Sequence, residues 1–160
     1  MAQDMFIKIA GIDGESNDSN HKNEIDVIHW EWQIKQASDM HSGSGGGAGK
    51  ATISDLYFEH YADRASPNLM KYCLTGKHVS DVVLTTRKAG GNPLEYMKIT
   101  MNDVIVTLVH PVSTQGDERI REQVGLSFAK VKQEYLIQNA QGGSGGTVTA
   151  SFNIKANKEQ

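Results

Sequence analysis

The sequence predicts a mainly β protein: a small antiparallel β barrel of two packed sheets, with one short α-helix and an extended Gly-rich arm. Strand-like segments separated by turn residues recur along the chain, and this spacing is typical of all-β barrels and sandwiches. Residues 66–76 depart from the pattern and carry the signals of a helix. The chain has 160 residues, which suits one domain, 1–160, around one core.

The expected strands follow from runs of alternating apolar and polar residues. They fall at residues 5–9, 24–36, 51–60, 79–88, 94–101, 104–110, 122–138 and 147–155. Asn102 and Asp103 are expected to form the turn between two of them. Within 122–138 the apolar parity changes between Phe128 and Val131, which predicts a bulge or a bend near Ala129.

Residues 24–36 show the clearest alternation. One face carries Ile28, Trp30, Trp32 and Ile34, and the other carries His29, Glu31, Gln33 and Lys35. This pattern predicts a strand with one packed face and one wet face. Because the two tryptophans share a face with two isoleucines, packing in the core is favoured over an exposed stacking platform. The opposite face must meet water, a cavity or a cargo.

The segment 38–50 is rich in glycine, too long for a tight hairpin and too poor in apolar residues to pack by itself. Loops of this kind usually contact a ligand or another subunit. A phosphate-binding loop is excluded, because Ser44 occupies the first glycine position and Ala51 follows Lys50 where Ser or Thr is needed. A strand is also expected after it, where a phosphate loop requires a helix.

The expected helix has Ser66 as N-cap, Pro67 at the first helical position and Gly76 just past the end. Two i,i+4 apolar pairs, Leu69 with Cys73 and Met70 with Leu74, predict a buried stripe. We therefore expect the helix to lie against the sheets at one end of the barrel, with Cys73 in the core as a small hydrophobe.

Composition excludes several classes of protein. The formal net charge of −3 and the pI near 6.0 argue against nucleic acid as the main partner. The single cysteine allows no intrachain disulfide and favours synthesis in a reducing compartment. The N-terminal residues lack the features of a signal peptide, and no apolar run approaches the roughly 18 residues needed to cross a bilayer.

No constellation in the sequence suggests an enzyme. The six histidines show no metal-ligand spacing, and we interpret them as polar residues on strand faces and loops. Glu15, Asp18 and the run 117–119 are interpreted as solvated loop charges. We predict no catalytic residue, no cofactor and no metal site.

Several motifs together resemble one family over nearly the whole chain. They are DMFIKI at 4–9, GESND at 14–18, EIDVIHWEW at 24–32, MHSGSGGGAGK at 40–50, SPNLMKYCLTGKH at 66–78, TTRKAGG at 85–91, EYMKIT at 95–100 and VGLSFAKVKQEY at 124–135. The chain resembles the hemolysin-coregulated proteins (Hcp), the inner-tube subunits of the bacterial type VI secretion system.

The resemblance implies a function in secretion, without catalysis. Members of the family form hexameric rings that stack into a tube, and a contractile sheath drives the tube outward beneath a spike of valine–glycine repeat proteins. Some members carry small toxin effectors in the lumen. The implied partners are thus the protein itself, the spike, the sheath and toxins, without nucleic acid or membrane insertion. The protein would be cytoplasmic when made, then secreted to the extracellular space or target cell without a signal peptide.

The resemblance also assigns roles to residues. It implies lumen or effector contacts by His29, Glu31 and Gln33, with Glu31 at the position where a small polar residue is common in the family. Six such carboxylates around a channel should disfavour acidic cargo. The arm would stack one ring on the next through Met40, His41, Ser42, Gly43, Ser44, Gly45, Gly46 and Gly47. The expected core includes Ile28, Trp30, Trp32, Leu69 and Cys73.

Two further expectations complete the prediction. Because the chain ends at Gln160, directly after the last strand, we expect no fused C-terminal toxin domain. The alternative function is a small-ligand-binding β-barrel carrier, whose pocket would be the barrel interior lined by Trp30 and Trp32.

Overall fold

The computed structural model describes residues 3–38, 49–90 and 93–160. Within these residues the fold is a set of antiparallel strands with one helix, which confirms the predicted mainly β class. The helix is α1 (Ser66–Thr75). The strands are β1 (Gln3–Ile9), β2 (Ile25–Asp26), β3 (His29–Glu31), β4 (Ile34–Lys35), β5 (Thr52–Ile53), β6 (Leu56–Tyr61), β7 (Val79–Lys88), β8 (Glu95–Val112), β9 (Arg121–Gln138), β10 (Ser144–Asn153) and β11 (Lys158–Glu159).

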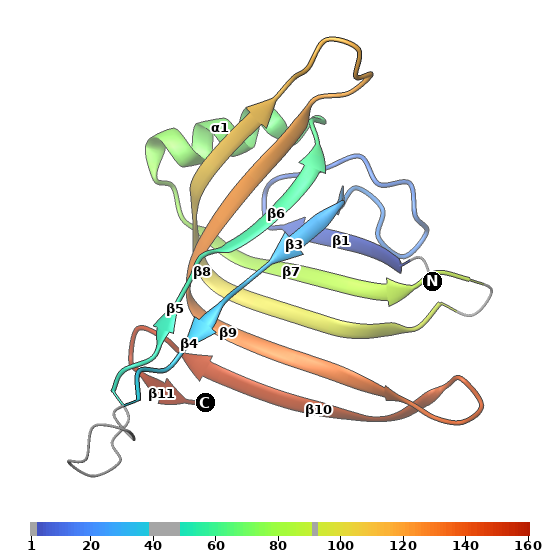
Figure 1. Ribbon diagram of the computed structural model, residues 1–160, viewed down its shortest axis with the longest axis vertical. Helices are drawn as coiled ribbons and strands as arrows, with labels where there is room; N and C mark the ends of the chain where they lie inside the picture. Colours follow the sequence, from blue (N-terminus) through green and yellow to red (C-terminus); the bar gives the residue numbers. More distant parts are fainter. Residues whose placement is uncertain (1–2, 39–48, 91–92) are drawn as a thin grey trace.

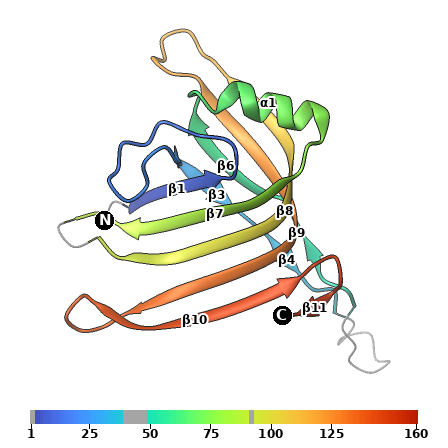
Figure 2. The same ribbon diagram turned by 180° about the vertical axis from the view of Figure 1, so that it is seen from behind.

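The strands form one curled sheet, whose two ends are joined by the chain and not by a strand pairing. Hydrogen bonds run in the order β11-β10-β9-β8-β7-β1-β2, and β9 also pairs with β6, which pairs with β3. Since β2 leads directly into β3 along the chain, the circuit closes through residues 25–31. The two predicted layers are thus parts of one curled sheet, while β4 and β5 form a separate two-stranded ribbon (Figures 1 and 2).

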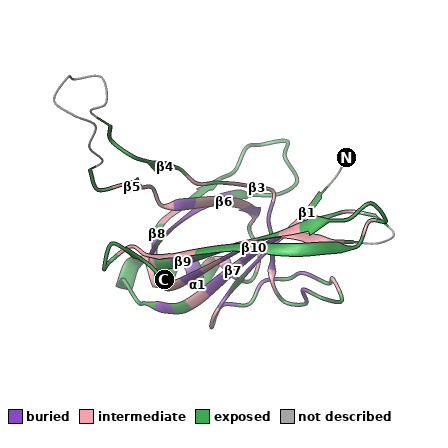
Figure 3. Ribbon diagram, turned by 90° about the horizontal axis from the view of Figure 1, so that it is seen from below, coloured by how far each residue is buried: buried purple, intermediate pink, exposed green. Residues whose placement is uncertain are grey.

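The core fills the interior of this curled sheet. Its fully buried side chains include Ile7, Leu56, Phe58, Leu84, Ile99, Met101 and Leu126. They come from alternate positions on β1, β6, β7, β8 and β9, as expected when one face of each strand packs inward. Each such side chain contributes about 1.5–3 kcal/mol by leaving water. Figure 3 shows buried stretches on β6, β8 and β9, whereas most of β10 is exposed.

Residues 24–36 and 51–60 are not single strands, as predicted, but chains of shorter ones. The first segment divides into β2, β3 and β4, and the second into β5 and β6. The divisions mark changes of pairing partner: β2 pairs with β1, β3 with β6, and β4 with β5. Residues 24–36 therefore pair with three different strands along their length.

In contrast, the predicted turn at Asn102–Asp103 is wrong, because β8 runs through it. Asp103 accommodates this with a positive φ of 53°. The β8–β9 register is unbroken on both sides, with Asn102 opposite Lys130 and Val104 opposite Phe128. The parity change in β9 therefore reflects a bend shared by the two strands, and the register shift lies instead between Val106 and Leu108.

The helix has the predicted place but a different N-terminus. Ser66 is its first residue, and the N-cap position belongs to Ala65, whose N–H donates to Asp63 Oδ1 at 2.8 Å. The predicted Ser66 cap is therefore wrong. The C-terminal prediction is confirmed: Gly76 has φ 67°, and its N–H donates to the Tyr72 carbonyl.

The helix buries one of the two predicted apolar pairs. Leu69 is fully buried and Cys73 packs against the core from a half-buried position. Met70 and Leu74 are 54% and 78% exposed, so the second pair does not belong to the core, contrary to prediction. The helix faces β8 along one narrow stripe.

A cluster of polar side chains around buried His21 and Arg87 ties the β1–β2 connection to the sheet. The two ring nitrogens of His21 lie 2.9 Å from Glu24 Oε2 and 2.6 Å from Glu95 Oε1. Its ring stacks on Phe6 at 4.4 Å, and the Arg87 guanidinium lies 5.0 Å from that ring.

Arg87 completes the cluster by binding Asp4 and Asp18. The prediction that Asp18 is a solvated loop charge is therefore wrong. The interpretation of His21 as a surface residue is also wrong, because His21 is buried. His60 corrects the same interpretation, because it is fully buried with its Nε2 2.8 Å from Glu122 Oε1.

Candidate functional site

The wet side of β3 is the first candidate surface. The His29 and Glu31 side chains are 58% and 63% exposed, and His29 Nε2 lies 3.4 Å from Glu31 Oε2. Trp30 points the other way and packs against the core. Beyond β3, Gln33 is also exposed, and its backbone N–H donates to Ser54 Oγ at 2.9 Å. The three predicted contact residues thus share one exposed stretch of chain.

Neighbouring strands extend this surface. Residues directly opposite one another in antiparallel strands point to the same side of a sheet. The pairings therefore place side chains in two rows across β3, β6, β9 and β8: His29, Glu59, Gln123 and His110, then Glu31, Tyr57, Gly125 and Leu108. We call these eight residues the outer polar face.

Gly125 lets the neighbouring Tyr57 ring lie close to the β9 backbone within this face. A Cβ at position 125 would come within 3.0 Å of Tyr57 Cε1, Leu108 Cβ and Thr107 Oγ1. The nearby Thr107 hydroxyl donates to Asp55 Oδ2 at 2.6 Å. A larger residue at position 125 would force these neighbours apart, so the sequence keeps the face closely packed with glycine.

Charge on the outer polar face is unevenly balanced. Glu59 has a permanent cation beside it, the Arg121 guanidinium at 3.3 Å. Within the described part of the chain, Glu31 is paired instead with His29, an imidazole that is charged only when protonated. Glu31 therefore adds net negative charge to the centre of an exposed strand.

The inward side chains of the same segment are mostly half-buried. Trp32 packs on Phe128 with ring centroids 5.8 Å apart, and its indole N–H donates to the Ser54 carbonyl at 3.1 Å. Ile28 and Trp30 are likewise intermediate in burial. Ile34, predicted to share this packed face, is 56% exposed because β4 belongs to the separate ribbon with β5.

The predicted stacking residues of the arm, 40–47, lie outside the residues that the structure describes. The strands at its base are described. Ile34 pairs with Ile53 and Lys35 with Thr52, and the ribbon leads away from the barrel (Figure 3). The two ends of the arm are therefore held side by side outside the core.

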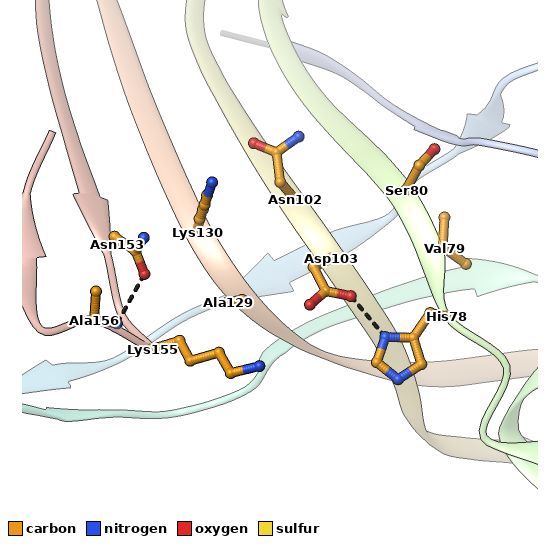
Figure 4. Close-up of a pocket in the computed structure, with 10 residues that line it drawn as sticks. All are labelled: His78, Val79, Ser80, Asn102, Asp103, Ala129, Lys130, Asn153, Lys155 and Ala156. Carbon is orange, nitrogen blue, oxygen red and sulfur yellow. Dashed lines mark hydrogen bonds and ion pairs between the residues drawn. The ribbon is translucent and has the colours of Figure 1, made fainter.

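A second surface is a depression of about 780 Å³ at the bend of β8 and β9 (Figure 4). His78 Nδ1 lies 2.6 Å from Asp103 Oδ1, and this hydrogen bond holds the pKa of Asp103 below its ordinary value. Lys130 and Lys155 also line the depression. Since Asp103 is already paired, the two lysines leave an excess of positive charge, a feature that sequence spacing did not predict.

The described residues contain neither a metal-binding cluster nor a membrane-spanning helix. No group of three or more His, Cys, Asp or Glu side chains there could hold a metal ion. No helix in residues 3–38, 49–90 or 93–160 is long and apolar enough to cross a membrane.

Solved structures with the same fold are bacterial secretion proteins. The crystal structure of Hcp1 from Salmonella typhimurium has a TM-score of 0.84 and 53% identity, with 100% of both chains covered. A type VI secretion system effector from Yersinia pestis has a TM-score of 0.78 and 43% identity, over 94% of this chain and 99% of that one. The fold and its relatives thus define a type VI secretion protein.

Sequence comparison gives the family. Protein hcp1 of Pseudomonas aeruginosa is 47% identical over 159 residues, which cover 98% of each chain. The sequence model of the family described as "Type VI secretion system effector, Hcp" matches residues 6–135. The chain belongs to the Hcp family of type VI secretion proteins, a structural secretion family and not a family of enzymes.

Proposed function

We propose that this protein is the structural subunit of a type VI secretion tube, in which hexameric rings stack and carry effectors in the lumen. The observation that carries the proposal is membership of the Hcp family over nearly the whole chain. The outer polar face adds a physical reason, because the exposed polar side chains of His29 and Glu31 suit a water-filled channel.

The proposed lumen residues are His29, Glu31 and Gln33. All three are exposed. They project from β3 and the two residues that follow it, a segment whose other side packs against the core through Trp30 and Trp32. In a six-fold ring each residue is repeated six times, so one carboxylate per subunit becomes a ring of six. Such a ring repels anionic cargo and attracts cationic cargo.

The proposed stacking element is the arm, residues 40–47. Its described base, the β4–β5 ribbon, leads away from the barrel and so can carry the arm to a neighbour. Each arm contact is small, but a ring makes the contact many times, and multivalency turns weak contacts into a stable stack.

The remaining partners follow from the proposed role. The subunit is made in the cytoplasm, assembles with itself, and is expelled by contraction of the sheath beneath a spike of the valine–glycine repeat family. Small toxins in the lumen leave with it.

The alternative function, a carrier with a ligand pocket inside the barrel, has less support. Phe58, Leu84, Ile99 and Leu126 occupy the interior with at most 1% of their surfaces exposed. Trp32, expected to line such a pocket, packs on Phe128 and hydrogen-bonds to Ser54. The geometry therefore favours assembly over internal ligand storage.

Native mass spectrometry of the purified full chain, with negative-stain images of the same sample, tests the proposal. We expect a dominant hexamer across a tenfold range of concentration and ring-shaped particles with a central channel. Monomers alone at the highest concentration would contradict the proposal.

A further inference from the structure

A second pocket lies beside the outer polar face, between β1, β3, β7 and β8, with a volume of about 370 Å³. This is near the lower end of the range for ligand sites, so it suits a single small group. Trp30, Tyr96, Met5, Met97 and Thr86 line it. His29 lines it as well, so the pocket adjoins the proposed lumen surface.

Thr86 gives the pocket an unsatisfied polar group. The residue is 3% exposed, and its buried hydroxyl has no hydrogen-bond partner among the described residues. Met5 and Met97 stand directly opposite Thr86 on the two adjacent strands, so the three side chains share one face. Because buried hydroxyls are nearly always hydrogen-bonded, the Thr86 hydroxyl selects a ligand with a polar atom at that point.

The rest of the lining suits a flat aromatic group. Trp30 and Tyr96 offer ring surfaces, and the thioethers of Met5 and Met97 make favourable contacts with aromatic rings. Tyr96 is held in place, because its hydroxyl donates to Gln3 Oε1 and its ring meets Tyr135 edge-on at 6.3 Å. A ligand that matches both features has an aromatic ring with one hydrogen-bonding group.

We infer that this pocket binds a phenol group, and that its natural occupant is a tyrosine side chain presented by a cargo protein. The ring would contact Trp30 and the two thioethers. The phenolic oxygen would hydrogen-bond to the Thr86 hydroxyl, which turns toward the pocket by rotation about χ1 when the ligand binds. The assignment of the occupant to a cargo rests on the proposed function, whereas the affinity of the pocket for phenols does not.

The test uses p-cresol, which is the side chain of tyrosine, and toluene, which lacks the hydroxyl. Both are titrated into the full chain carrying 13C-labelled methionine methyl groups. We expect saturable shifts at Met5 and Met97 and none at Met70, which is exposed on α1. We expect p-cresol to bind about fivefold more tightly than toluene or better, the effect of one hydrogen bond to a buried group.

Variants separate the hydroxyl from its surroundings. Thr86→Val should reduce p-cresol affinity to that of toluene, whereas Thr86→Ser should keep the preference. Thr85→Val is the matched control: Thr85 is 2% exposed, and its partners Phe6 and Lys98 place it on the other face of β7. No saturable shift at Met5 and Met97, or an undiminished preference in folded Thr86→Val, would overturn the proposal. If Thr86→Val does not fold, Met97→Trp is used to fill the pocket; this variant lacks the Met97 reporter, and the shift at Met5 should disappear. A saturable Met5 shift in folded Met97→Trp would overturn the proposal.

Native mass spectra of the same samples distinguish this inference from the proposed function. If the chain binds phenols but forms no hexamer, the inference about the pocket stands and the proposed tube function is refuted. A hexamer without phenol binding would refute the pocket alone. Binding by monomers but not by hexamers would overturn the cargo role, because a neighbouring subunit would then cover the pocket.

Discussion

In the proposed tube, Glu31 is the residue whose charge would act most directly on cargo. Its carboxylate lies at the centre of the outer polar face, and the described residues give it His29 as a partner and no permanent cation. The six-fold arrangement proposed above repeats this charge around a channel, where low-dielectric walls strengthen its field.

We expect Glu31→Gln to raise the affinity of assembled rings for an acidic peptide by about tenfold at low ionic strength, since six negative charges leave the channel. Fluorescence anisotropy with labelled hexaglutamate measures the change, and added salt should reduce it. Glu118→Gln is the matched control, because it removes the same charge from the β8–β9 connection. Equal effects of the two variants would contradict the lumen position of Glu31.

His60 and Glu122 form a buried pair, and removing one partner should destabilise the protein more than replacing both. Burial opposes ionisation of the carboxyl, but the hydrogen bond and charge of His60 outweigh it and hold the pKa of Glu122 below its ordinary value. His60→Leu leaves a buried carboxylate unpaired, which should cost about 3–5 kcal/mol in urea unfolding at pH 7. Replacing both residues with Leu should recover most of the loss. A double variant less stable than the single one would contradict this account.

Asp18 links stability to pH. The Arg87 hydrogen bond holds the pKa of Asp18 below its ordinary value. A carboxyl with a lowered folded-state pKa stabilises the protein above its unfolded pKa of about 4, and this stabilisation is lost as the pH falls through the folded value.

Asp18→Asn should therefore lower Tm at pH 7 and weaken the dependence of Tm on pH below about 4. Thermal unfolding from pH 2 to pH 7 measures both effects. Asp117→Asn, on the β8–β9 connection, serves as control and should change neither. If the Tm of Asp18→Asn and that of the unaltered protein depended on pH in the same way, the contact of Asp18 with Arg87 would not contribute to the pH dependence of stability.

For single residues, the sequence predicts those features that depend on residues nearby in the chain. The alternation of residues 28–33 correctly separates exposed His29, Glu31 and Gln33 from half-buried Trp30 and Trp32. It does not predict the burial of His21, whose partner Glu95 is 74 residues away in the chain. Only the folded β1–β7–β8 arrangement brings those charges together, so spacing rules could not find them.

Among the elements, β7 has the predicted bounds, 79–88, and the helix lies within the predicted segment. The long strands were harder to predict because they change partners along their length. The first half of β9 pairs with β6 and β8, and the second half pairs with β8 and β10. Periodicity shows the change of face in β9 but not its cause, which is a bend shared with β8 at Asp103.

Removal of residues 42–49 tests the arm as an element. Because the β4–β5 ribbon at its base is separate from the curled sheet, we expect the barrel to fold with Tm within a few degrees of the full chain. Ring formation should persist, and ring-on-ring stacking should weaken. Thermal unfolding and the length distribution of tubes in electron micrographs measure these effects. Loss of folding would show that the arm belongs to the core.

For the molecule as a whole, the curled sheet separates two tasks. Its interior packs apolar side chains that hold the fold, and its outer polar face presents charge to solvent. In a ring of six, the same pair of complementary surfaces meets at every contact, so one subunit design closes the assembly. Sequence resemblance suggests which residues line the proposed channel, and the exposure of His29, Glu31 and Gln33 in the fold is consistent with that proposal.

Cryo-electron microscopy of the purified ring tests the central claim most directly. We predict a six-fold particle in which β3 lies at the channel wall, with the side chains of His29 and Glu31 pointing into the bore. A ring whose β3 strand lies on the outer circumference or against a neighbouring subunit would contradict the account.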